Sequence, residues 1–176
     1  MAANDPVRNL ALAALDADEM LRDLLVPGAD VRLSFSELYR YVNDPAFELS
    51  PAAQDKLSAD PAAAADLERL IAARPFAYMP RQAAASTSGA VRREVERAVL
   101  TLTPSRATPA QVYLGVEIVD LENADVPTHL FVRSPSGAWL RQALPAFSGN
   151  RAQVLLEANS AIANALSTPE SEVYLR

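Results

Sequence analysis

The segment QVYLGVEIVDL, residues 111–121, decides the fold class of the second half of this chain. Its apolar side chains alternate with a mixed set of side chains; the apolar ones are Val112, Leu114, Val116 and Ile118. Because successive side chains of a β-strand point to opposite faces, this alternation gives the strand one apolar face. The segment therefore predicts a strand in a sheet with one buried side.

Short β patterns surround this segment, at residues 95–102, 128–133, 138–144, 153–157 and 173–175. Turn residues separate them, and the sequence SPSG at residues 134–137 is typical of a hairpin turn. Residues 159–167 instead have alanines and larger apolar residues at helical spacing, which indicates a short helix. Six short strands predict an antiparallel β-sandwich or a partly open barrel in a β-rich domain over residues 94–176.

The first half of the chain has the period of a helix. After Asp5 and Pro6, apolar residues recur at spacings of three and four, which predicts a helix over residues 6–25. Three more helix starts follow: a capping box of Ser34 and Glu37, Ser50 before Pro51, and Asp60 before Pro61. The predicted fold class is therefore α+β, with a small helical bundle in an acidic domain over residues 1–77.

The segment between these domains, YMPRQAAASTSGAVRR at residues 78–93, has no apolar face of either period. Proline, glycine and small residues dominate it, which predicts a flexible linker. Proteases cut exposed segments of this kind, and the candidate cleavage sites for a protease that reads basic side chains are Arg81, Arg92 and Arg93. A plain tether is the alternative interpretation.

Charge and composition exclude several classes of function. The net charge is −6, and residues 1–75 hold 13 acidic and 7 basic side chains, so we expect no direct nucleic-acid binding. The apolar stretches are far shorter than the roughly 18 to 20 residues that span a membrane. With no recognisable secretory signal, the sequence predicts a cytoplasmic protein without membrane contact. The chain has no cysteine, so it has neither disulfides nor thiolate metal ligands.

Catalytic groups are sparse. The single histidine, His129, lies in a predicted strand, and a Ser-His-Asp triad would have to combine it with Ser134 and with Asp120 or Asp125. The acids of residues 120–125 include Glu122, but they lack the ligand spacing and the glycine of a calcium loop. No glycine-rich phosphate loop occurs. We therefore expect no enzyme activity, no cofactor and no bound metal.

One segment carries a family resemblance. LSPAAQDKLSADPAAAADLERLIAAR, residues 49–74, resembles the helix pair of the small bacterial anti-sigma domain. Zinc-bearing members of that family hold the metal with one histidine and two cysteines, and the corresponding positions here are Lys56, Asp60 and Ala63. These three residues cannot form a tetrahedral zinc site. The resemblance thus implies a zinc-free member that binds and masks a sigma factor.

The helix predicted after Ser34 supplies candidate partner-binding residues. Phe35, Leu38, Tyr39 and Val42 have the i, i+3, i+4, i+7 spacing of a helix that docks in a groove. Closure of the helical bundle by the same four side chains is the alternative interpretation.

A second interface is expected on the β-rich half, with Tyr113, Phe131 and Trp139 as candidates because tyrosine and tryptophan concentrate binding energy. Together with Tyr174 these aromatics would also suit stacking on a sugar ring, but the absence of a secretory signal favours a protein partner.

These observations predict a non-catalytic regulatory adaptor or inhibitor, and the resemblance implies that it is an anti-sigma-like regulator of transcription. The alternative is a protein-interaction module of a bacterial stress or defence system, controlled by proteolysis of the linker. The expected partner is accordingly a sigma factor or a regulatory protease.

We predict that the purified chain contains no stoichiometric zinc, because the three positions that correspond to the zinc ligands carry the wrong side chains. Elemental analysis should find no zinc, and the helical circular dichroism signal should be unchanged by a chelator. An equimolar amount of zinc in the purified protein would contradict this prediction.

Overall fold

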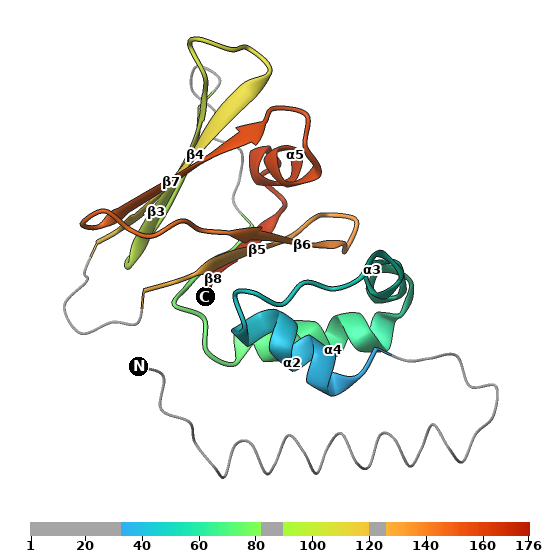
Figure 1. Cartoon of the computed structure of the whole chain (residues 1–176). Coiled ribbons are helices and arrows are strands. Elements are labelled where there is room, and N and C mark those ends of the chain that lie inside the picture. Colours follow the sequence, from blue (N-terminus) through green and yellow to red (C-terminus); the bar gives the residue numbers. More distant parts are fainter. Residues whose placement is uncertain (1–32, 82–89, 120–125) are drawn as a thin grey trace, which may run out of the picture. The chain divides into compact units, whose positions relative to one another are not determined.

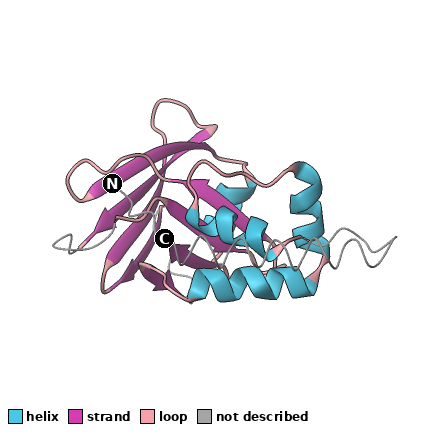
Figure 2. Cartoon of the chain, turned by 60° about the horizontal axis from the view of Figure 1, so that its bottom comes forward, coloured by secondary structure: helices cyan, strands magenta, loops and turns pink. Residues whose placement is uncertain are grey.

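A computed structural model describes residues 33–81, 90–119 and 126–176 of the chain (Figure 1). Within these residues there are four helices and two antiparallel sheets of four strands each, so the fold is α+β, as the sequence predicts (Figure 2). The chain divides into two compact units, residues 1–70 and 71–176. In the described part of the chain, no helix has both the length and the apolar character needed to cross a membrane.

The described helices of the first unit begin at the caps that the sequence predicts. They are α2 (Phe35–Asn43), α3 (Pro51–Ala59) and α4 (Pro61–Ala72), the last of which continues into the second unit. The Ser34 hydroxyl accepts from the Glu37 amide, and the Glu37 carboxylate accepts from the Ser34 amide, both at 3.0 Å. This capping box satisfies two amides that the first helical turn leaves without partners. The helix predicted over residues 6–25 lies outside the described residues, so the complete bundle stays a prediction.

The second unit contains both sheets. The first sheet has the strand order β1 (Ala77–Met79), β8 (Glu172–Leu175), β5 (His129–Arg133), β6 (Trp139–Ala143). The second has the order β2 (Val91–Val95), β3 (Ala98–Pro104), β4 (Gln111–Ile118), β7 (Arg151–Glu157). The predicted turn at residues 134–137 joins β5 to β6, with Gly137 at φ 90°. The left-handed conformation at this position favours glycine.

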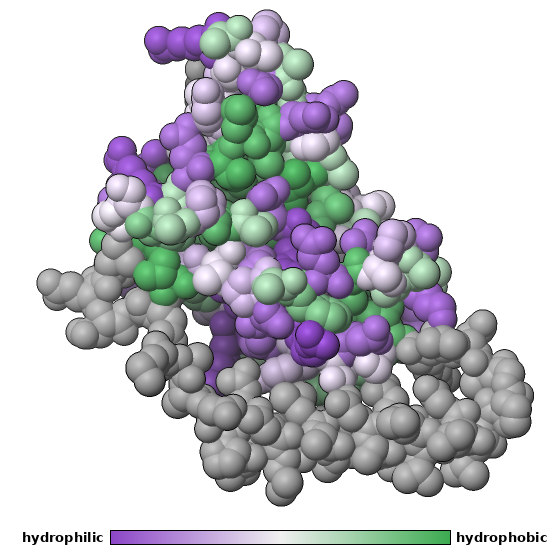
Figure 3. All heavy atoms as spheres, viewed as in Figure 1, coloured by the Kyte–Doolittle hydropathy of each residue, from purple (hydrophilic) through white to green (hydrophobic). Residues whose placement is uncertain are grey.

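One apolar core joins the two sheets. It contains Val112, Leu114 and Val116, three of the alternate side chains of β4 that the sequence predicts to be buried. Residues of β3, β5 and β8 and three residues of α5 (Ala161–Ser167) complete it. Leu114, Leu130 and Leu166 are completely buried there, and burial of each such side chain contributes about 1.5–3 kcal/mol. On the face drawn in Figure 3, hydrophobic side chains also reach the surface in the region of the sheets, bordered by hydrophilic ones. We call the core side of each sheet its inner face and the opposite side its outer face.

The largest differences between the structure and the sequence-based boundaries lie in β1, β2 and β3. A turn at Glu96 and Arg97 interrupts the single strand predicted over residues 95–102, so that β2 and β3 form a hairpin. Tyr78 and Met79 lie in β1 and residues 91–93 lie in β2, although the sequence assigned all of them to the linker. A strand of three residues such as β1 has too little sequence for a period to appear, and its conformation depends on pairing with β8.

Arg93 is the main polar exception in the core. It lies on the inner face of β2 and is only 2% exposed. The sequence suggested that Arg93 is a protease cleavage site, but a side chain buried in this way is not accessible to a protease. Its guanidinium donates to the carbonyl oxygens of Ser171 at 2.6 Å, Thr168 at 2.5 Å and Leu166 at 3.3 Å. α5 ends at Ser167, so Arg93 satisfies carbonyls at and beyond the helix C-terminus, where positive charge is favourable.

The electrostatics of Arg93 reflect this position. Burial lowers the pKa of the guanidinium, and the charge of Glu170 opposes that change. Because arginine titrates far above neutral pH, the side chain remains a charged donor. The hydrogen bonds therefore tie the second sheet to α5 through a buried cation.

We predict that Arg93→Ala lowers the free energy of unfolding by about 3 kcal/mol or more, since it leaves a cavity and removes the hydrogen bonds that three carbonyls accept from the guanidinium. Arg92→Ala is the matched control: Arg92 is the next residue of β2, is exposed, and forms only a surface ion pair with Glu94. It should change stability by less than about 1 kcal/mol. Urea denaturation of both variants checks this, and equal stability losses would contradict the structural role of Arg93.

Candidate functional site

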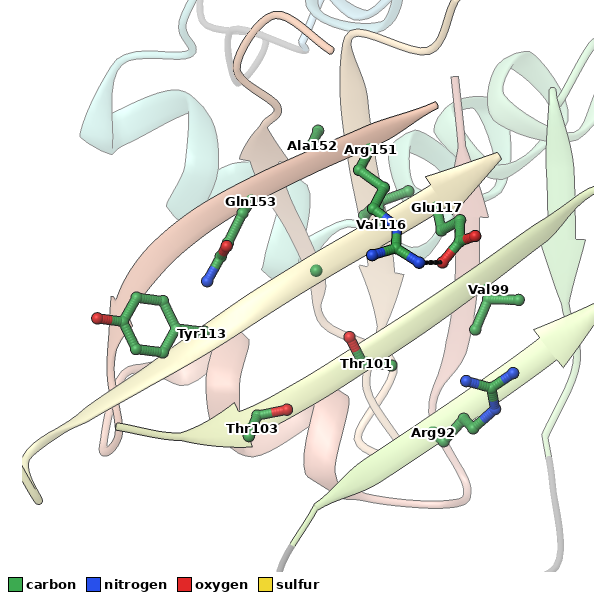
Figure 4. A pocket seen from close by; sticks show the side chains of 11 residues that line it. Arg92, Val99, Thr101, Thr103, Tyr113, Val116, Glu117, Arg151, Ala152 and Gln153 are labelled. Carbon is green, nitrogen blue, oxygen red and sulfur yellow. Dashed lines mark ion pairs between the residues drawn. The ribbon is translucent and has the colours of Figure 1, made fainter. Parts of the chain in front are cut away.

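The outer face of the second sheet has a depression of about 440 Å³, here called the Gly115 hollow (Figure 4). It lies where three strands place a row of residues side by side: Gly115 of β4 pairs with Thr101 of β3 on one side and with Gln153 of β7 on the other. Gly115 has no side chain, and the Thr101 hydroxyl lies so close to it that a Cβ at residue 115 would be 2.7 Å from Thr101 Oγ1. The same alternation that buries the inner face of β4 therefore positions this site.

The two ends of the hollow differ chemically. At one end lies Tyr113, which is 37% exposed, and its cross-strand neighbour Leu155 is 46% exposed. At the other end Glu117 and Arg151 form an ion pair at 2.9 Å (Figure 4). The apolar end and the charged end lie at opposite ends of the hollow along β4. This difference would fix the direction in which a peptide segment binds.

The charges at the hollow are balanced. Arg151 pairs with Glu117, and Arg92, which also lines the hollow, pairs with Glu94 at 2.9 Å. A balanced surface does not attract the phosphate backbone of a nucleic acid. Together with exposed tyrosine and leucine, it suits a protein segment of mixed polarity.

The candidate residues of α2 do not share one exposed face. Leu38 and Val42 are buried, together with Tyr41, whereas Phe35 is 37% exposed and Tyr39 is half-buried. The buried face of the helix thus includes Tyr41, which the spacing argument did not select. The helical period shows which residues lie along one face of the helix. The packing of the helix against the rest of the unit determines which neighbouring residues are buried with that face.

The candidate residues of the second interface also separate. Tyr113 lies on the outer face of the second sheet, whereas Phe131 and Trp139 lie in the first sheet. Phe131 is completely buried, and the Trp139 ring lies 5.7 Å from that of Tyr174. Of these aromatics, therefore, only Tyr113 contributes to the Gly115 hollow, which argues against an aromatic platform for sugars there.

His129 is buried in β5 and is not paired with Ser134. Arg141 Nη2 lies 2.5 Å from His129 Nε2, and Thr128 Oγ1 lies 2.9 Å from Nδ1. Since a guanidinium only donates, Nε2 must accept and the proton sits on Nδ1, facing Thr128. The Ser134 hydroxyl instead accepts from the Ala138 amide in the hairpin turn. Asp120 and Asp125 lie outside the described residues.

The remaining candidates can be placed as follows. Arg81 is exposed and forms an ion pair with Glu172 at 3.2 Å, and Arg92 is exposed within β2. In residues 33–81, 90–119 and 126–176, no three acidic or histidine side chains are grouped so as to hold a metal ion. The row of Thr101, Gly115 and Gln153 was not selected from the sequence. The sequence feature that could have indicated this site is the glycine inside the predicted strand, because a glycine in a strand often marks a place where another group approaches the backbone closely.

We predict that Thr101 and Gly115 are energetically coupled. A Cβ at residue 115 would lie 2.7 Å from Thr101 Oγ1, so Gly115→Ala should require a change of the Thr101 rotamer and cost about 1 kcal/mol. In a Thr101→Ala background the same change should be neutral or stabilising, because alanine suits a strand better than glycine. A double-mutant cycle by urea denaturation measures the coupling. Additive effects would contradict this arrangement.

Comparison of the chain with protein-family models, curated proteins and solved structures finds no match. The Gly115 hollow is therefore interpreted from its own residues.

Proposed function

We propose that this protein is a non-catalytic regulatory adaptor or inhibitor that binds a protein partner through the Gly115 hollow. The observation that carries this proposal is the exposed pair of Tyr113 and Leu155 beside a polar depression. Aromatic side chains at the centre of an apolar patch with a polar rim are characteristic of protein interfaces.

The partner that fits this surface best is an extended peptide segment. β7 is an edge strand of the second sheet, because it pairs with β4 and with no second strand among the described residues. An extended segment can pair with such an edge through its backbone while its side chains enter adjacent pockets. In this proposal an apolar side chain of the partner contacts Tyr113 and Leu155, and a polar side chain reaches Gln153 or Arg151.

The identity of the partner is a finer proposal. The resemblance of residues 49–74 to the anti-sigma helix pair supports a sigma factor and a role in transcription regulation in the cytoplasm. α3 and α4 begin at the prolines of that segment. The alternative is an interaction module of a stress or defence system whose partner is a regulatory protease, and the exposed Arg81, which lies outside the strands, favours this reading.

We predict that Tyr113→Ala weakens partner capture by at least about tenfold and leaves the melting temperature nearly unchanged, because an exposed interface tyrosine contributes to binding but little to folding. Val119→Ala is the matched control, since Val119 is a 60% exposed apolar residue that does not line the hollow. The measurement is affinity purification of tagged wild type and variants from the native host, followed by mass spectrometry and by binding assays with the purified partner.

The outcomes of this experiment are distinct. A sigma factor that is captured by the wild type and lost with Tyr113→Ala supports the anti-sigma-like role, whereas a protease with the same behaviour supports the alternative. Equal capture by wild type and Tyr113→Ala would exclude the Gly115 hollow as the binding surface.

A further inference from the structure

A second depression in the unit of residues 71–176 has a different chemical character. It has a volume of about 370 Å³ and is lined by Arg74, Arg97 and Arg176, with Phe76, Pro75 and Pro127 among its apolar walls. We call it the arginine hollow. A volume of this size lies within the range of small-molecule sites, which is roughly 300–1,000 Å³.

Three distant segments bring these arginines together. Arg74 follows α4, Arg97 lies in the turn between β2 and β3, and Arg176 follows β8. The periodic patterns of the sequence contain no sign of this convergence, because it depends on how the ends of the two sheets meet.

Two of the guanidinium groups are held in place by backbone carbonyls. Arg97 Nη1 donates to the Phe76 carbonyl at 3.1 Å, and its guanidinium carbon lies 4.2 Å from the centre of the Phe76 ring. Arg176 Nη1 donates to the Ile71 carbonyl at 3.2 Å. The hydrogen bond of Arg97 uses only part of the donor capacity of its guanidinium, which has five N–H groups. A ligand would therefore meet donors that are already oriented.

Two of the arginines that line the arginine hollow form no ion pair with any described residue. Among the described residues, no carboxylate lies within ion-pair distance of Arg74 or Arg97. Arg74 and Arg97 are therefore two neighbouring cations without a counter-ion among the described residues, and a bound anion would supply one. The concentration of cations here contrasts with the net charge of −6 of the whole chain and with the balanced pairs of the Gly115 hollow.

We propose that the arginine hollow binds a small multivalent oxyanion of the phosphate class, such as the diphosphate portion of an organic ligand. Guanidinium groups match phosphate oxygens through paired hydrogen bonds, and several of them can contact one phosphate group from different directions. Phe76 and the two prolines form an apolar wall that suits the carbon portion of the ligand. This site is separate from the Gly115 hollow in both its residues and its chemistry.

Isothermal titration of the full chain with pyrophosphate tests the proposal. We expect saturable binding, an affinity at least about tenfold weaker in Arg74→Gln and in Arg97→Gln, since a charge-assisted hydrogen bond is lost in each, and weaker binding at high salt. Arg74 is the sharper variant, because it is exposed and its replacement removes none of the hydrogen bonds described above. A melting temperature equal to that of the wild type confirms that this variant is folded.

Arg106→Gln is the matched control. Arg106 is an exposed arginine beyond the far end of β3, whereas Arg97 immediately precedes the first residue of that strand. This control should bind pyrophosphate as the wild type does. No binding by the wild type, or an equal loss in Arg74→Gln and Arg106→Gln, would overturn the proposal. Tighter binding of citrate than of pyrophosphate would also overturn it, because the site would then select carboxylates.

Discussion

Burial of one face of β4 is the constraint on which the rest of the β-rich unit depends. Leu114 and Val116 are buried between the two sheets, and this fixes the register of β4 against β3 and β7. A slip by one residue would expose every apolar side chain of the strand. The same register determines which residues point outward, so Tyr113, Gly115 and Glu117 share the outer face. The Gly115 hollow is thus a consequence of the core.

Arg93 provides a polar complement to this apolar constraint. It occupies an inner-face position of β2, opposite Leu100, yet its charge is satisfied by carbonyls at the end of α5. An unpaired charge at such a position would be strongly unfavourable, so the helix end and the arginine depend on each other. α5 in turn contributes Ala163, Ala165 and Leu166 to the core. The buried cation therefore links strand, helix and core in one arrangement.

The two depressions of the β-rich unit differ in the charge and the type of the residues that line them. The Gly115 hollow has paired charges and an exposed tyrosine, which is the composition of a protein-binding surface. The arginine hollow has a cluster of cations beside an aromatic ring, which is the composition of an anion site. A protein that recognises a partner at one surface and a small anion at another has the elements required for regulated binding.

The sequence by itself determined the features whose causes are local. The capping box at Ser34, the α+β class and the hairpin turn at residues 134–137 depend on neighbouring residues, so their patterns could be recognised without a structure. The tertiary structure alone decided that β1 and β2 are strands, that Arg93 is buried and that Tyr41 rather than Tyr39 completes the buried face of α2. It also decided both hollows, because each combines residues from strands or turns far apart in the chain. Register and long-range packing bring such residues together, and neither leaves a period in the sequence.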